Sequence, residues 1–93
     1  MNQQRYKDIK KIIISFLSDD IKRMGLNINE VDDKINILES GLIDYFRFID
    51  LLAMIDNELV VEINLNNLDQ ENFGSLFSLI NFIVDEEKNN DFI

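Results

Sequence analysis

The chain has 93 residues, of which 46% are hydrophobic and 29% are charged, and it contains no cysteine, histidine or proline. This length suits one small domain, residues 1–93, with enough apolar residues for a packed core. Without cysteine there are no disulfides or thiolate sites, and without histidine the chain lacks the commonest acid–base and metal-binding side chain, so we expect neither an enzyme nor a metal site.

Charge is unevenly distributed along the chain. Residues 1–24 carry six basic and three acidic residues, whereas residues 25–93 carry three basic and fifteen acidic ones, for a net charge of −9. An acidic surface repels nucleic acid and anionic membranes and attracts basic protein patches, although charge that serves only solubility is the simpler alternative. No apolar run approaches the roughly 20 residues of a membrane span and no secretory signal is visible, so we expect a cytoplasmic monomer with protein partners.

The first predicted helix covers about residues 4–18 and can extend toward Met24. Its apolar residues recur at helical spacing, and Gly25 can adopt the positive φ that ends a helix. These apolar residues are Tyr6, Ile9, Ile12, Ile13, Phe16, Leu17, Ile21 and Met24.

A long connection, residues 27–40, follows this helix. Its turn-forming residues predict an irregular path, and a loop of this length in a small domain usually has a structural or functional reason. We expect its apolar side chains to fix it to the core, namely Leu26, Ile28, Val31, Ile35, Ile37 and Leu38.

The second predicted helix runs from Phe46 to about Leu59. Asp44 is its expected N-cap, because a carboxylate there accepts hydrogen bonds from free backbone N–H groups. One apolar stripe, formed by Phe48, Leu51, Leu52, Ile55 and Leu59, should face the core.

The last third of the chain completes the predicted fold. Residues 60–63 predict an extended connector, residues 66–73 one or two helical turns, and residues 86–93 approximately a solvated tail. Between them, Ser75 should cap a last helix with Leu76, Leu79, Ile80, Ile83 and Val84 facing inward. The sequence thus predicts an all-α four-helix bundle with three main helices, a short third helix and a long first loop.

The order and spacing of these segments resemble the acyl and peptidyl carrier proteins over nearly the whole chain. The approach to that family's modification site is matched by Leu38-Glu39-Ser40-Gly41-Leu42-Ile43-Asp44. Its recognition helix is matched by residues 46–59, and its fourth helix by residues 75–84. The entry to its short third helix is matched by Glu62-Ile63, Asn67-Leu68 and Glu71-Asn72-Phe73.

The resemblance implies a cofactor position at Asp44 and Tyr45. In this family a transferase moves phosphopantetheine from coenzyme A to a serine after the Asp, and the arm then holds an acyl or aminoacyl group as a thioester. Tyr45 replaces that serine, and its phenol is bulkier and carries its oxygen farther from the backbone. We therefore expect no phosphopantetheine on the chain as written, and we expect Ser40 to be a turn residue.

Three interpretations of Tyr45 remain open. The protein is a natural relative that keeps a docking surface without the arm, a carrier whose serine was substituted, or a helical protein with an accidental resemblance. They correspond to three functions: a non-catalytic partner in a fatty acid, polyketide or nonribosomal-peptide type pathway; an authentic carrier; and a structural or regulatory bundle. Only a serine form would need a phosphopantetheinyl transferase.

The resemblance also implies that the second helix docks on basic patches of partner enzymes. The candidate partner-binding residues are Phe46, Arg47, Asp50, Ala53 and Asp56. Asp50 and Ala53, three residues apart, share one helix face. Arg47 either alters partner choice or pairs with Asp50, an exposed contact of about 0.3 kcal/mol. The simpler alternatives are a solvated helix face and packing of Phe46 in the core.

Overall fold

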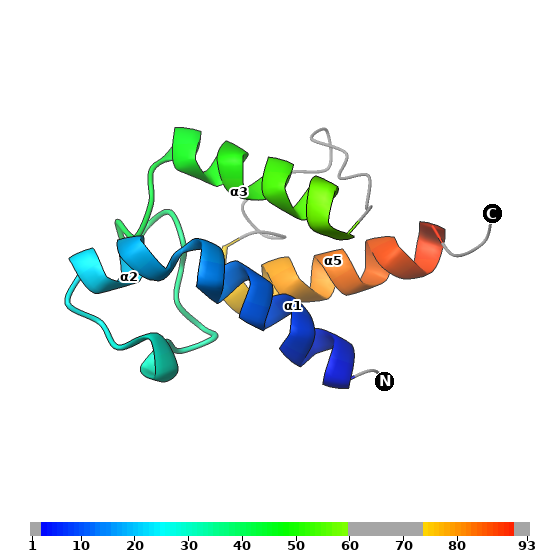
Figure 1. The fold of residues 1–93 in the computed structure, drawn as a ribbon, viewed down its shortest axis with the longest axis horizontal. Coiled ribbons are helices and arrows are strands. Elements are labelled where there is room, and N and C mark those ends of the chain that lie inside the picture. The colour runs from blue at the N-terminus through cyan, green and yellow to red at the C-terminus, as the bar shows by residue number, and fades with distance from the viewer. Residues whose placement is uncertain (1–2, 60–73, 91–93) are drawn as a thin grey trace.

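The computed structural model describes residues 3–59 and 74–90, which form a small all-helical assembly (Figure 1). Its elements are the α-helices α1 (Gln3–Phe16), α2 (Ser18–Arg23), α3 (Tyr45–Leu59) and α5 (Leu76–Asn90), and the 3-10 helix η1 (Ile28–Glu30). These ranges contain one isolated β-bridge and no strand, which is compatible with the predicted helical bundle. The connector predicted at residues 60–63 and the short helix predicted at residues 66–73 lie outside the described residues.

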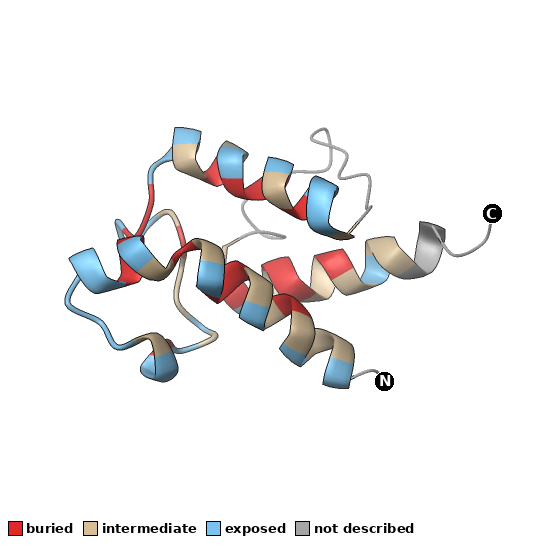
Figure 2. Ribbon diagram, viewed as in Figure 1, coloured by how far each residue is buried: buried red, intermediate tan, exposed pale blue. Residues whose placement is uncertain are grey.

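The apolar faces of α1, α3 and α5 turn toward one another and form the core (Figure 2). Four of the five predicted residues of the α3 stripe are buried, and Leu59 packs against the core from its edge. In α5 the same holds for the predicted inward residues, with Val84 at the edge. The prediction that Leu26 contacts the core was wrong, because this residue follows the end of α2, where the chain turns away, and is 40% exposed.

The predicted first helix is divided in two. Leu17 has φ −93° and ψ 8°, which separates α1 from α2, although the N–H of Leu17 still bonds to the Ile13 carbonyl. The second piece ends as predicted at Gly25, where φ is 80°. The N–H of Gly25 bonds to the Lys22 carbonyl and that of Leu26 to the Ile21 carbonyl, which is the Schellman arrangement of a helix C-terminus.

The long first loop is fixed to the start of α5. Asn36 and Ser75 form the β-bridge, and the N–H groups of Leu76 and Phe77 donate to the carbonyls of Ile35 and Asp33, at 3.0 and 2.8 Å. The predicted Ser75 cap is confirmed, because its hydroxyl accepts from the N–H of Ser78 at 3.1 Å. The loop carbonyls therefore accept hydrogen bonds from N–H groups at the start of α5 that have no partner within the helix. The same hydrogen bonds fix the position of the loop.

The loop is also tied to α1 through Asp33. The Tyr6 hydroxyl donates to one Asp33 oxygen at 2.6 Å, and the Lys10 ammonium lies 2.5 Å from the other. Burial alone would raise the pKa of Asp33, but the hydrogen bonds from Lys10 and Tyr6 hold it below its usual value. Burial and the bond to Asp33 raise the pKa of Tyr6, so both groups keep their ordinary charge states near neutral pH.

The last helix is longer than predicted. The solvated tail expected from about residue 86 is instead helical as far as Asn90, and Glu87 forms a two-pronged ion pair with Arg5 of α1. This contact between the chain's two ends raises the pKa of Arg5, mainly through the hydrogen bonds from its guanidinium to Glu87. No helix within residues 3–59 and 74–90 combines the length and apolarity that a membrane span requires.

Candidate functional site

A tight turn places the start of α3. Gly41 has φ 82°, a left-handed conformation that glycine adopts without strain. The Ser40 hydroxyl accepts from the N–H of Leu42 at 3.2 Å, which confirms Ser40 as a turn residue. The turn is fixed by the side chains of Leu42 and Ile43, which are buried in the core. Asp44, the next residue, is exposed at the surface.

Asp44 is the N-cap of α3, as predicted. One of its carboxylate oxygens accepts from the N–H of Arg47 at 2.8 Å, and its carbonyl accepts from the N–H of Phe48 at 3.0 Å. A side-chain acceptor three residues before its donor is the usual geometry of an aspartate cap. The cap fixes the direction in which the following two aromatic residues leave the turn.

Tyr45 and Phe46 are both exposed at the start of α3. Tyr45 is 61% and Phe46 is 81% exposed, so Phe46 does not pack in the core. Their ring centroids lie 6.4 Å apart with an interplanar angle of 71°, an edge-to-face pair. The structure thus brings the residue at the family's attachment position together with the first candidate partner contact.

The remaining candidates on α3 lie on its outer side. Asp50, Ala53 and Asp56 are all exposed, whereas the buried stripe points the other way, toward α1 and α5 (Figure 2). At 100° per residue, Phe46, Asp50 and Ala53 fall on one line opposite that stripe, and Asp56 lies to one side of the line. The predicted shared face of Asp50 and Ala53 is therefore present, and Phe46 extends it to the helix start.

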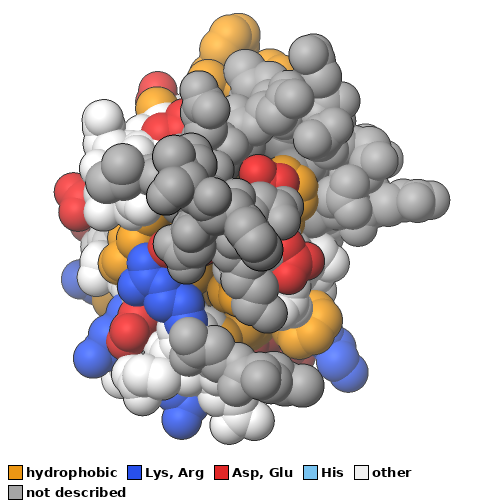
Figure 3. Space-filling view, turned by 90° about the vertical axis from the view of Figure 1, so that its right-hand side faces the viewer, with side chains coloured by type: hydrophobic (Ala, Val, Ile, Leu, Met, Phe, Trp, Pro, Cys, Tyr) orange, Lys and Arg blue, Asp and Glu red, His pale blue; other side chains and the backbone are white. Residues whose placement is uncertain are grey.

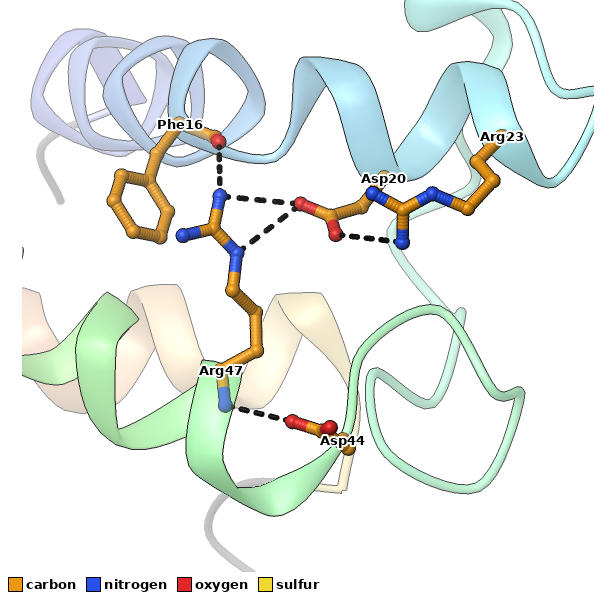
Figure 4. A network of polar contacts seen from close by, with 5 residues as sticks. All are labelled: Phe16, Asp20, Arg23, Asp44 and Arg47. Carbon is orange, nitrogen blue, oxygen red and sulfur yellow. Dashed lines mark hydrogen bonds and ion pairs between the residues drawn. The ribbon is translucent and has the colours of Figure 1, made fainter.

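Arg47 differs from its candidate companions. Its guanidinium points to α1 and α2, where it donates to one Asp20 oxygen at 3.3 Å and to the Phe16 carbonyl at 3.2 Å (Figure 4). It also lies 4.2 Å from the centroid of the Phe16 ring. The exposed pair with Asp50, one of the two alternatives for Arg47, is thus replaced by contacts inside the fold, because Arg47 lies about 100° around the helix from Phe46, on the side of α1.

Sequence reasoning missed Asp20, the partner of Arg47. This side chain is 5% exposed and also lies 3.5 Å from the Arg23 guanidinium. Asp20 comes seven residues after Ile13 and three after Leu17, which is a spacing at which a core-facing stripe continues. A carboxylate at a core-facing position requires a paired charge, because burying it alone is costly. Its position in the sequence therefore could have indicated a basic partner from another element.

A hollow of about 490 Å³ lies between α2 and the turn before α3. The Arg47–Asp20–Arg23 contacts form its charged wall, and none of its lining residues offers a hydroxyl, thiol or amine nucleophile. Its lining consists of Asp19, Asp20, Arg23, Gly41, Leu42, Ile43, Asp44 and Arg47. In the part of the chain that the structure describes, no three potential metal ligands gather.

Comparisons with known proteins leave the family open. No protein-family model matches the chain, and the search of curated proteins finds no match either.

Proposed function

We propose that this chain is a carrier-like partner protein in a fatty acid, polyketide or nonribosomal-peptide type pathway. It is a bundle of the acyl carrier protein type that acts in the cytoplasm as a monomer, docks basic enzyme patches through α3, and carries no phosphopantetheine. The observation that carries this proposal is the Asp44-capped turn. It leaves position 45 exposed at a helix start and continues into an outward, acidic face.

The chemistry of position 45 decides between a carrier and its unmodified relative. A phosphodiester at that position would lie near the helix N-terminus, whose dipole favours negative charge. The Tyr45 side chain is accessible, yet its phenol oxygen lies a ring's length beyond the place of a serine hydroxyl. A transferase shaped for serine therefore cannot align it for attack on coenzyme A.

Intact mass after incubation with coenzyme A and a broad-specificity phosphopantetheinyl transferase tests this proposal. We expect no mass change for the unaltered chain and a gain of one phosphopantetheine for Tyr45→Ser. The double variant Tyr45→Ser with Ser40→Ala should be modified equally, since Ser40 belongs to the turn. Modification of the unaltered chain, or a Tyr45→Ser variant that folds but stays unmodified, would overturn the proposal.

The docking face can be tested in the same assay. In the Tyr45→Ser background, Asp50→Lys should slow modification, because it reverses a charge on the line that runs along α3 from Phe46. Asp85→Lys, an exposed position on α5, is the matched control and should leave the rate unchanged. Equal rates for both lysine variants would argue that α3 does not contact the transferase.

A further inference from the structure

We propose that the outer face of α3 selects arginine: a guanidinium of the partner's basic patch stacks on Phe46 while it pairs with Asp50. This inference rests on the docking face of the proposed function and names the chemistry of the group that docks there. It is drawn from two arrangements in the chain, one inside the fold and one on its surface.

The inner arrangement already holds a guanidinium in this way. Arg47 lies over the Phe16 ring at 4.2 Å from its centroid and bonds to the Asp20 carboxylate at 3.3 Å (Figure 4). The guanidinium thus contacts an aromatic face and a carboxylate at the same time. A planar guanidinium can stack on a ring while its N–H groups donate to a carboxylate, which a lysine ammonium does less well.

The outer face carries the same two components, without an arginine of its own. Phe46 is 81% exposed, and Asp50 follows four residues later on the same side of α3, a spacing at which side chains are neighbours. Tyr45 meets Phe46 edge to face at 6.4 Å. We infer that this contact restrains the Phe46 ring, so that less side-chain entropy is lost when a guanidinium settles on it.

The charges around this face favour a cationic partner. Arg47 is the one basic residue in the α3 sequence, and its guanidinium is engaged with Asp20. Figure 3 shows the end of the molecule opposite to the start of α3, and the Lys and Arg side chains visible there lie in its lower half. An incoming arginine therefore meets carboxylates at this face and no competing cation of α3.

A second exposed aromatic residue provides a matched control. Phe77 of α5 is 54% exposed, and its ring lies 6.0 Å from that of Tyr6. The carboxylate beside that ring pair, Asp33, is already engaged by Tyr6 and Lys10. Among the residues that the structure describes, Phe77 thus offers an aromatic ring whose neighbouring acid, Asp33, is already engaged, and it should not distinguish arginine from lysine.

The test uses two capped peptides of equal length, in which glycine alternates with three arginines or with three lysines. Their affinities are measured from backbone amide shifts in NMR titrations of the full chain. We expect the arginine peptide to bind roughly two- to fivefold more tightly, with the largest shifts between residues 44 and 57. Phe46→Leu should remove this preference while lysine-peptide binding persists, Asp50→Asn should weaken both peptides, and Phe77→Leu should change neither.

Equal affinities for the two peptides would overturn the inference, as would a preference that survives Phe46→Leu or shifts that gather on α5. The peptide assay contains no phosphopantetheinyl transferase, so its outcome is independent of the modification assay that tests the proposed function. A Tyr45→Ser variant that is modified normally, combined with equal peptide affinities, would overturn only the selection of arginine. Failure of that modification, combined with a clear arginine preference, would overturn only the carrier role.

Discussion

At the scale of single residues, Arg47 connects the start of α3 to the junction of α1 and α2. Asp20 is nearly fully buried, and a buried carboxylate is tolerated only when charged or polar partners compensate for lost hydration. Arg47 supplies that compensation together with Arg23, and it also binds the Phe16 carbonyl at the end of α1. The same contacts hold the helix turn that displays Tyr45 and Phe46.

Replacing Arg47 by alanine should therefore destabilise the fold. We expect the free energy of unfolding, measured by urea denaturation, to fall by about 1.5–3 kcal/mol, the usual worth of hydrogen bonds to a charged group. Arg23 remains near Asp20, so the loss of stability should be smaller than for a buried carboxylate left without any basic partner. The exposed residue Lys22 is the control, because Lys22→Ala should change stability by less than about 0.5 kcal/mol.

The double variant Arg47→Met with Asp20→Leu separates two explanations. If the cost arises from an uncompensated buried carboxylate, removing both partners should recover much of the lost stability, since apolar replacements of buried pairs are often neutral. A double variant as unstable as Arg47→Ala would instead assign the cost to the guanidinium's own contacts with the ring and carbonyl of Phe16, which both variants lack.

At the scale of elements, the first loop joins α1 to α5 and thereby sets the turn from which α3 starts. Its backbone carbonyls accept hydrogen bonds from the first N–H groups of α5. Its Asp33 carboxylate is bound by Tyr6 and Lys10 of α1. The long loop is thus an ordered connection between α1 and α5. This is the structural role that was expected from its length.

Tyr6→Phe should destabilise this connection in a pH-dependent way. We expect a loss of about 1–2 kcal/mol near neutral pH, since a hydrogen bond to a carboxylate is removed. The folded pKa of Asp33 is lowered, so its stabilisation is present above the unfolded pKa, roughly 3.9, and is lost as the pH falls through the folded pKa. The folded pKa of Tyr6 is raised, so its contribution is complete below roughly pH 10 and disappears as the pH rises further.

Urea denaturation of the unaltered chain and of Tyr6→Phe across this range gives the measurement. The difference between them should form a plateau that declines at both acidic and alkaline ends. A difference that stays constant from acid to alkali would mean that the effect does not depend on the charge of the Asp33 carboxylate that accepts the Tyr6 hydrogen bond.

At the scale of the whole molecule, the net charge of −9 opposes the compact state. We expect added salt to stabilise the fold, because the Debye length is about 10 Å at 0.1 M and shortens further above it. Recovery of about 1 kcal/mol would raise the Tm by roughly 4–8 °C for a domain of this size. Thermal unfolding followed by circular dichroism at low and high sodium chloride measures this shift.

The control removes negative charge directly. Asp50→Asn combined with Asp85→Asn, both at exposed positions, should show a smaller rise of Tm with salt. A Tm that falls as salt is added would show that the ion pairs, such as Arg5–Glu87 and Lys10–Asp33, outweigh the general repulsion.

The sequence by itself determined where α1, α3 and α5 lie along the chain and the caps of α3 and α5, because these features depend on residues close together in the chain. Helical spacing predicted the buried side of α3, and the short reach of a carboxylate or hydroxyl predicted the caps at Asp44 and Ser75. A glycine in the chain predicted the end of α2 for the same local reason. The candidate face on α3 was equally readable, since a helix that buries one side must expose the other.

Only the tertiary structure decided where the long polar side chains go. Arg47 can reach Asp50 on its own helix or Asp20 on another, and the choice depends on which element lies beside it and on the cost of leaving Asp20 buried without a partner. The same applies to the loop carbonyls that close the start of α5 and to Glu87, whose partner Arg5 lies at the other end of the chain. Local patterns specify helices, whereas contacts between residues distant in sequence exist only once those helices are packed.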